Sequence, residues 1–164
     1  LLTTSLATAC TTVRTPELPA INTAGDTQIS VGKFVWWDLL TNDPQGAKAF
    51  YAALFDWQFD DTGTGEYFVI SSDDKPIGGI ALHTSREQHA APALWLSSLS
   101  VADVDAAVER VQAAGGRVLE GPETVSPRGR LAIVRDPLGA PLVLLRAQPG
   151  DPPDAPPRDR KSVV

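Results

Sequence analysis

Apolar residues along this chain change from strand-like to helix-like spacing and back again, twice. Phe34 to Leu40 is an apolar and aromatic run typical of a buried strand. Asn42 or Asp43 can then cap a helix whose apolar residues recur at helical spacing. These residues are Ala47, Phe50, Tyr51 and Leu54. Three further apolar segments predict three short strands, at 57–59, 66–71 and 77–82.

The second half of the chain shows the same order of patterns. A strand is predicted at 94–99, and Asp103 then caps a helix that stops at Gly115-Gly116. Strands follow at 118–119, 131–135 and 142–146. The turn between the last two, Asp136-Pro137-Leu138-Gly139, is strongly specified, since Pro fixes φ and Gly permits positive φ.

These two halves form an internal repeat at an offset of about sixty residues. Asp43 and Asp103 open corresponding helices, and Lys75-Pro76-Ile77-Gly78 is echoed by Asp136-Pro137-Leu138-Gly139. Because neither half is expected to bury its apolar face alone, the two must pack together. The pattern predicts one domain over 32–147, built from two βαβββ modules with a cavity between them.

Composition narrows the class of protein. The chain has 164 residues, 43% hydrophobic residues and a formal net charge of −6, which is typical of one globular domain. No basic stripe is present, so we expect no nucleic-acid partner. No apolar run in the domain is long enough to cross a membrane.

The segment before the domain carries the chain's one cysteine, Cys10. Ala7-Thr8-Ala9-Cys10 resembles a bacterial lipobox, and a Thr- and Pro-rich stretch follows it. We interpret residues 1–31 as a leader and flexible tether, with Cys10 lipidated and the domain held at a membrane outside the cytoplasm. The alternative is a disordered leader with an incidental cysteine on a cytoplasmic protein. The chain contains no Met, so we expect its true start to lie upstream.

Residues 148–164 are predicted to be a disordered tail, because 150–157 is Pro-rich and acidic. The last six residues, Asp159 to Val164, match the translation of a common sequencing-adapter string. We interpret them as an artefact, with a native polar tail as the alternative.

Three stretches together resemble the vicinal oxygen chelate (VOC) superfamily of glyoxalase I, bleomycin-resistance proteins, fosfomycin-resistance enzymes and extradiol dioxygenases. The stretches are FVWWDLLTNDPQGAKAFYAALFDWQF, SLSVADVDAAVERVQAAGG and RLAIVRDPLGAPLVLL. The resemblance implies an α+β fold in which the two modules form a cupped, mixed eight-stranded sheet with the helices outside. It also implies a homodimer and an active site inside the cup.

Enzymes of this family hold a divalent metal on the first and last strands of each module, through His, Gln or Glu. The resemblance places Trp36, Leu96 and Val143 at three of these positions, and the internal repeat places Leu82 at the fourth. None of these side chains can bind a metal. His83, the neighbour of Leu82, is the remaining candidate, but a single imidazole is more often structural. We therefore expect no metal and no cofactor.

If Trp36 faces into the cup, the period of a strand brings Phe34 and Asp38 with it. A carboxylate in an apolar cup needs a partner, and Arg130, Arg135 or a cluster of backbone N–H groups is expected to supply it. Asp38 is the best candidate for a catalytic group, with a structural carboxylate as the alternative. Trp36, Tyr67 and Trp95 are candidates to stack on a flat ligand, whereas core packing is expected for Trp37 and Trp57. The predicted ligand-binding set is Phe34, Trp36, Asp38, Tyr67, Leu94, Leu96, Ser98, Arg130 and Val143.

Three functions remain open. The favoured one is a metal-free domain that binds a small aromatic molecule, as in the bleomycin-resistance branch. The second is a metal-dependent lyase or dioxygenase with a displaced metal site. The third is a non-catalytic structural lipoprotein. The fold alone does not choose among them.

Overall fold

The computed structural model describes residues 18–83 and 93–154. It contains two βαβββ modules, as the periodicity predicts. The first module comprises β1 (Phe34–Thr41), α1 (Pro44–Phe55), β2 (Gln58–Asp61), β3 (Tyr67–Ser72) and β4 (Lys75–Leu82). The second comprises β5 (Leu94–Ser100), α2 (Val104–Ala113), β6 (Arg117–Val125), β7 (Gly129–Arg135) and β8 (Pro141–Ala147).

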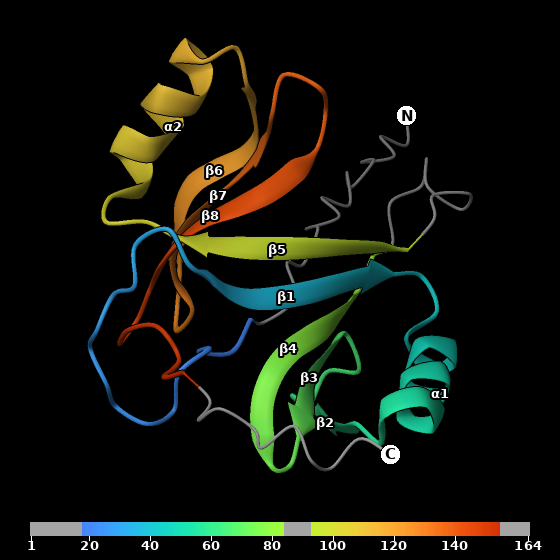
Figure 1. The fold of residues 1–164 in the computed structure, drawn as a ribbon. Helices are drawn as coiled ribbons and strands as arrows, with labels where there is room; N and C mark the ends of the chain where they lie inside the picture. The colour runs from blue at the N-terminus through green and yellow to red at the C-terminus, as the bar shows by residue number, and fades with distance from the viewer. Residues whose placement is uncertain (1–17, 84–92, 155–164) are drawn as a thin grey trace, which may run out of the picture.

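All eight strands belong to one open mixed sheet in the order β2-β3-β4-β1-β5-β8-β7-β6. The central strands β1 and β5 are antiparallel, and each pairs in parallel with the last strand of its own module. Figure 1 shows β1 and β5 side by side in the centre, with α1 beside the first module and α2 beside the second. The predicted α+β class and the helices outside the sheet are confirmed.

Both helices begin as the sequence predicts, but they pack differently. The carboxylates of Asp43 and Asp103 each accept a hydrogen bond from a backbone N–H of the first helical turn. Helix α2 buries Val104, Ala107 and Val108 against β7 and β8. Helix α1 buries no residue fully, and its predicted apolar face leaves Phe50 exposed.

The structure contains the internal repeat, but the residues that correspond in its two halves differ from those inferred from the Pro-Gly motifs. Pro76 lies within β4, whereas Pro137 lies in the turn before β8. The ladders define the equivalence better, because Asp38 pairs with Gly79 in one module and Ser98 pairs with Val143 in the other. The residue equivalent to Val143 is therefore Gly79, and the prediction of Leu82 is wrong. Strand β6 is also longer than the predicted 118–119, and two register shifts interrupt its pairing with β7.

The described parts of both terminal segments pack against the domain, which differs from the expected tether to residue 31 and tail from residue 148. Ile21 is buried in the same apolar cluster as Trp36, and Asn22 is buried beside it. Asp151 is buried as well, and its carboxylate accepts hydrogen bonds from Ser30 N and Ser100 Oγ, both at 2.6 Å. Figure 1 shows the blue and red terminal loops together beside β1.

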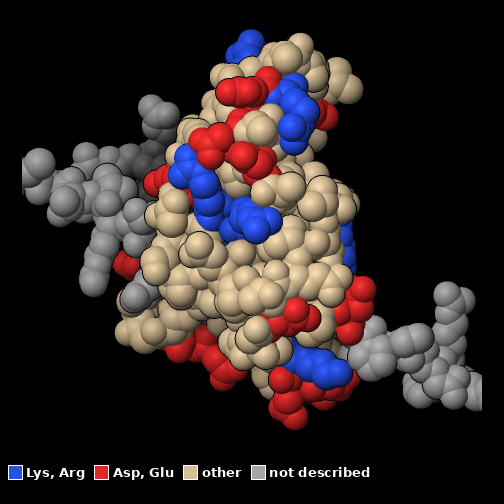
Figure 2. All heavy atoms as spheres, turned by 90° about the vertical axis from the view of Figure 1, so that its left-hand side faces the viewer, with Lys and Arg blue, Asp and Glu red and all other residues tan. Residues whose placement is uncertain are grey.

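Other sequence-based predictions lie outside the described residues. These are lipidation of Cys10 and the assignment of the last six residues. No helix in the described part of the chain combines the length and hydropathy that a membrane crossing requires. On the face shown in Figure 2, basic and acidic side chains lie next to one another rather than in separate broad areas.

Candidate functional site

A cavity of about 530 Å³ opens where β1 and β4 separate. The β1–β4 ladder begins only at the pair Asp38–Gly79, so the residues before these two positions diverge. Pro76 contributes to this separation because it has no N–H to donate to a neighbouring strand. The opening is closed on its other side by residues 21–24 and 152–154 of the terminal segments.

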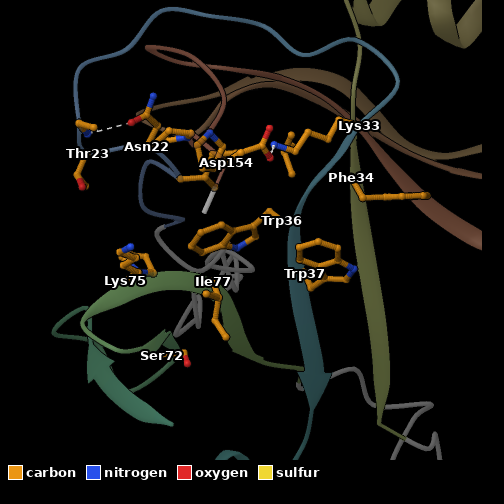
Figure 3. A pocket seen from close by; sticks show the side chains of 16 residues that line it. Asn22, Thr23, Lys33, Phe34, Trp36, Trp37, Ser72, Lys75, Ile77 and Asp154 are labelled. Carbon is orange, nitrogen blue, oxygen red and sulfur yellow. Dashed lines mark hydrogen bonds and ion pairs between the residues drawn. The ribbon is translucent and has the colours of Figure 1, made fainter. Parts of the chain in front are cut away.

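Trp36 and Trp37 both line this cavity (Figure 3), but only the Trp37 indole is exposed to it. Trp36 faces the interior of the sheet and is buried, whereas the Trp37 side chain is 44% exposed. Phe34 also lines the cavity, but a bulge separates it from Trp36. Phe34 lies opposite Leu99, on the helix side, so the expected strand alternation fails at Val35.

A buried polar cluster lies behind Trp36 and consists of Trp36, Asp38, Tyr67 and Arg128. The Tyr67 hydroxyl donates to Asp38 Oδ1 at 2.5 Å, and the Trp36 indole N–H lies 3.1 Å from both oxygens. The Arg128 guanidinium donates to Asp38 Oδ2 at 3.1 Å and to the Tyr67 hydroxyl at 2.8 Å. Its Nε donates to the carbonyl oxygen of Pro19 at 2.8 Å. This cluster joins both modules and the N-terminal segment.

The electrostatics of this cluster favour a neutral phenol beside an ion pair. Burial, and then the negative charge of Asp38, raise the pKa of the Tyr67 hydroxyl well above its ordinary value of 10.0. Burial is the largest single effect and lowers the pKa of Arg128, but the charge of Asp38 and the interactions with Tyr67 and Asp38 together outweigh it, so the pKa is raised. Tyr67 therefore remains a hydrogen-bond donor, and Arg128 remains a cation.

Gly79 makes room for this cluster. A Cβ atom at this position would overlap the Tyr67 hydroxyl and would lie 2.7 Å from Asp38 Oδ1. In the first module, the Tyr67 hydroxyl and the Asp38 carboxylate therefore fill the space that a side chain at this last-strand position would occupy. This explains why the internal repeat has a Gly where the second module has Val143.

The four positions at which the family resemblance would place metal ligands are now Trp36, Gly79, Leu96 and Val143. Trp36, Leu96 and Val143 belong to one buried apolar cluster, and Gly79 has no side chain. None of the four supplies an N, O or S donor for a divalent metal. His83 follows β4 and is exposed. Within 18–83 and 93–154, no three or more His, Cys, Asp or Glu side chains form a group suited to a metal ion. These residues do not fit the family's metal.

Arg130 is not the partner of Asp38, because its side chain lies on the α2 side of the sheet. There the guanidinium donates to both carboxylate oxygens of Asp105 at 2.6 Å, and this hydrogen bonding lowers the pKa of Asp105. Arg135 is exposed at the end of β7 and is not the partner either. The period of β7 explains this, since Arg130 shares a face with Ala132 and Val134.

The remaining predicted site residues occupy the interior or its edge. Leu96 and Val143 pack beside Trp36, and Ser98 is buried opposite it on β5. Leu94 is partly exposed near the start of β5. Trp95 lies on the other face, where its indole N–H donates to the Tyr51 hydroxyl at 3.0 Å. Trp95 therefore does not line the cavity.

Sequence reasoning missed several functional candidates. Arg128 lies in the turn between β6 and β7, where no periodic pattern assigns a direction to its side chain. Trp37 was expected in the core but lines the cavity, and Lys33 and Lys75 line it as well. Because successive side chains of a strand point to opposite faces of the sheet, the neighbours Trp36 and Trp37 could not both face into the cup.

Comparison with known proteins identifies relatives of this domain. The model of the Glyoxalase/Bleomycin resistance protein/Dioxygenase superfamily matches residues 33–144. The anthracycline biosynthesis protein DnrV of Streptomyces peucetius is 34% identical over 134 residues, which cover 73% of this chain and 49% of DnrV. The provisionally named glyoxylase CFP32 of Mycobacterium tuberculosis is 34% identical over 116 residues, covering 68% and 44%. The chain thus spans about half the length of these curated relatives.

Solved structures share the fold at low sequence identity. Methylmalonyl-CoA epimerase bound to methylmalonyl-CoA matches with a TM-score of 0.52 and 17% identity, covering 76% of this chain and 100% of the epimerase. Homoprotocatechuate 2,3-dioxygenase from Arthrobacter globiformis matches with a TM-score of 0.51 and 18% identity, covering 82% and 39%.

Proposed function

Because this chain belongs to the Glyoxalase/Bleomycin resistance protein/Dioxygenase superfamily, we propose that it is a member that binds a flat aromatic molecule without a divalent metal. The ligand lies in the cavity between β1, β4 and the terminal segments, against Trp37. The observation that carries the proposal is the exposed Trp37 indole in the wall of this largely apolar cavity.

The dimensions and lining of the cavity support a small-molecule ligand. Its volume of about 530 Å³ falls within the range of pockets that enclose drug-sized molecules. Apolar side chains dominate the wall, and Ile77 lies below the indoles in Figure 3. Ser72, which is partly exposed, also lines the cavity and can orient a ligand.

The polar cluster around Trp36 supports a preorganised cavity. The Trp36 N–H is held by Asp38 and Tyr67, so the interior behind the cavity is fixed before any ligand arrives. A preformed cavity binds a ligand with little loss of side-chain entropy. Asp38 is already paired with Arg128, which makes it a positioning group in this proposal rather than a base.

Two features support an aromatic ligand without a metal. The positions at which the family would hold a metal carry Trp36, Gly79, Leu96 and Val143, which offer no donor atoms for one. In addition, the relative DnrV is named as an anthracycline biosynthesis protein, and anthracyclines are flat polycyclic aromatic compounds.

The test is a fluorescence titration of the chelator-treated protein with quinizarin, a flat hydroxyanthraquinone. We expect saturable quenching of tryptophan emission and an affinity about two- to tenfold weaker in Trp37→Ala, from loss of one stacking contact. Trp95→Ala is the matched control, because Trp95 has a similar exposure of 38% but lies outside the cavity.

Equal affinities of Trp37→Ala and the wild type would place the ligand elsewhere. Binding or turnover that requires added Zn²⁺, Mn²⁺ or Fe²⁺ would favour the metal-dependent enzyme instead. Retained melting temperature in both variants would show that the change is local.

A further inference from the structure

The charges around the cavity differ in sign from those of the chain as a whole. The formal net charge is −6, yet the cavity lining includes two of the four lysines, Lys33 and Lys75. Asp154 is the single acidic residue among the described residues of the lining. The local balance is therefore positive in an acidic protein, which favours a negatively charged ligand at this place.

Asp154 reaches Lys33 from the C-terminal segment. Its carboxylate forms a salt bridge with the Lys33 ammonium, and the Asp154 side chain is 83% exposed. Figure 3 shows this pair on one side of the Trp36 ring and Lys75 on another. Among the described residues, no salt bridge to Lys75 is found.

The position of Asp154 is set by Asp151 three residues earlier. The Asp151 carboxylate is buried against Ser30 and Ser100, and its backbone N–H donates to the carbonyl oxygen of Gln28 at 2.8 Å. The segment is thus anchored at Asp151, while Asp154 beyond the anchor is exposed. A carboxylate on an exposed side chain can leave Lys33 at little cost, because exposed ion pairs contribute little to stability.

From these contacts we infer that the cavity takes an aromatic carboxylate, whose carboxylate replaces that of Asp154 on Lys33 while its ring lies against Trp37. Asp154 is an internal substitute for the ligand's acidic group. Lys75, on the other side of Trp36, adds to the attraction for the anion. This inference rests on the proposed function, since it names the chemical class of the molecule bound there.

The experiment compares anthracene-9-carboxylate with its neutral analogue 9-anthracenemethanol by fluorescence titration of the full chain at low ionic strength. We expect the carboxylate to bind more tightly to the wild type. Asp154→Asn should tighten carboxylate binding about two- to fivefold, in line with the strength of an exposed ion pair, and leave the alcohol unchanged. Lys33→Met should weaken carboxylate binding by a similar factor. In the Lys33→Met background, Asp154→Asn should have no further effect.

The matched control is Lys48→Met, because the Lys48 ammonium lies over the Phe68 ring and outside the cavity. Equal affinities for the carboxylate and the alcohol in all variants would overturn the inference and leave the proposed function intact. An Asp154→Asn effect that persists without Lys33 would also overturn it, since the carboxylates would then not compete for that lysine. Failure of both anthracenes to bind would contradict the proposed function itself.

Discussion

Replacing Arg128 with Met removes the cation that joins the two modules. Arg128 is 2% exposed, and its guanidinium donates to Asp38, to Tyr67 and to the carbonyl oxygen of Pro19. Methionine fills much of the same space, so the main loss is electrostatic. The Asp38 carboxylate would remain buried with only the Tyr67 and Trp36 donors.

Breaking a buried pair in this way costs about 3–5 kcal/mol, because it leaves an uncompensated charge. For a chain of this size the melting temperature should fall by roughly 10 °C. Urea unfolding followed by tryptophan fluorescence measures the change as a lower midpoint at an unchanged m-value.

Arg130→Met is the matched control, since Arg130 also pairs with an aspartate but does so on the exposed face. Its effect should be far smaller, because exposed ion pairs contribute little. The double variant Arg128→Met with Asp38→Asn should lose less stability than the two single variants added together, because the double variant buries no unpaired charge. An Arg128→Met variant as stable as Arg130→Met would refute the assignment of Arg128 as the cation that joins the two modules.

Further predictions concern the cluster and the surface. The unfolded phenol of Tyr67 ionises near pH 10.0 whereas the folded phenol keeps its proton, so stability should fall above this pH by about 1.4 kcal/mol per pH unit. Tyr67→Phe should remove this part of the alkaline slope in urea titrations across that range. Gly79→Ala should lower the urea midpoint sharply, because its methyl group would overlap the Tyr67 hydroxyl. We also propose a homodimer that uses the exposed aromatic side chains of α1, so Phe50→Glu should yield monomers by light scattering, and a monomeric wild type would contradict this. Finally, we propose lipid attachment at Cys10; Cys10→Ala should then release the protein from bacterial membranes, and a wild type found in the soluble fraction would contradict it.

The order of elements could be predicted from the sequence because local signals specify it. Asp43 and Asp103 cap helices as expected, and the strand periods predict β1, β5 and β8 within two residues. The register of the internal repeat could not be predicted from Pro and Gly alone. Pro76 and Pro137 each lie two residues before a Gly, but Pro76 lies in a strand and Pro137 lies in a turn.

The site was predicted less completely because its contacts join distant parts of the chain. Asp38 was expected to have a cationic partner, and it has one, but Arg128 lies ninety residues away in a turn with no side-chain period. The bulge at Val35 directs Phe34 away from the face that Trp36 occupies, and strand alternation does not foresee a bulge. The terminal segments carry little hydrophobic pattern, yet Ile21 and Asp151 are buried, and residues 21–24 and 152–154 close the cavity.

The most direct test of the central claim is a crystal structure of the chelator-treated protein soaked with anthracene-9-carboxylate. The proposed binding mode predicts electron density for the three fused rings against Trp37, between β1 and β4, with no metal ion inside the cup. Density for the rings against the exposed aromatic side chains of α1, or a ligand ordered only through a bound metal, would contradict it.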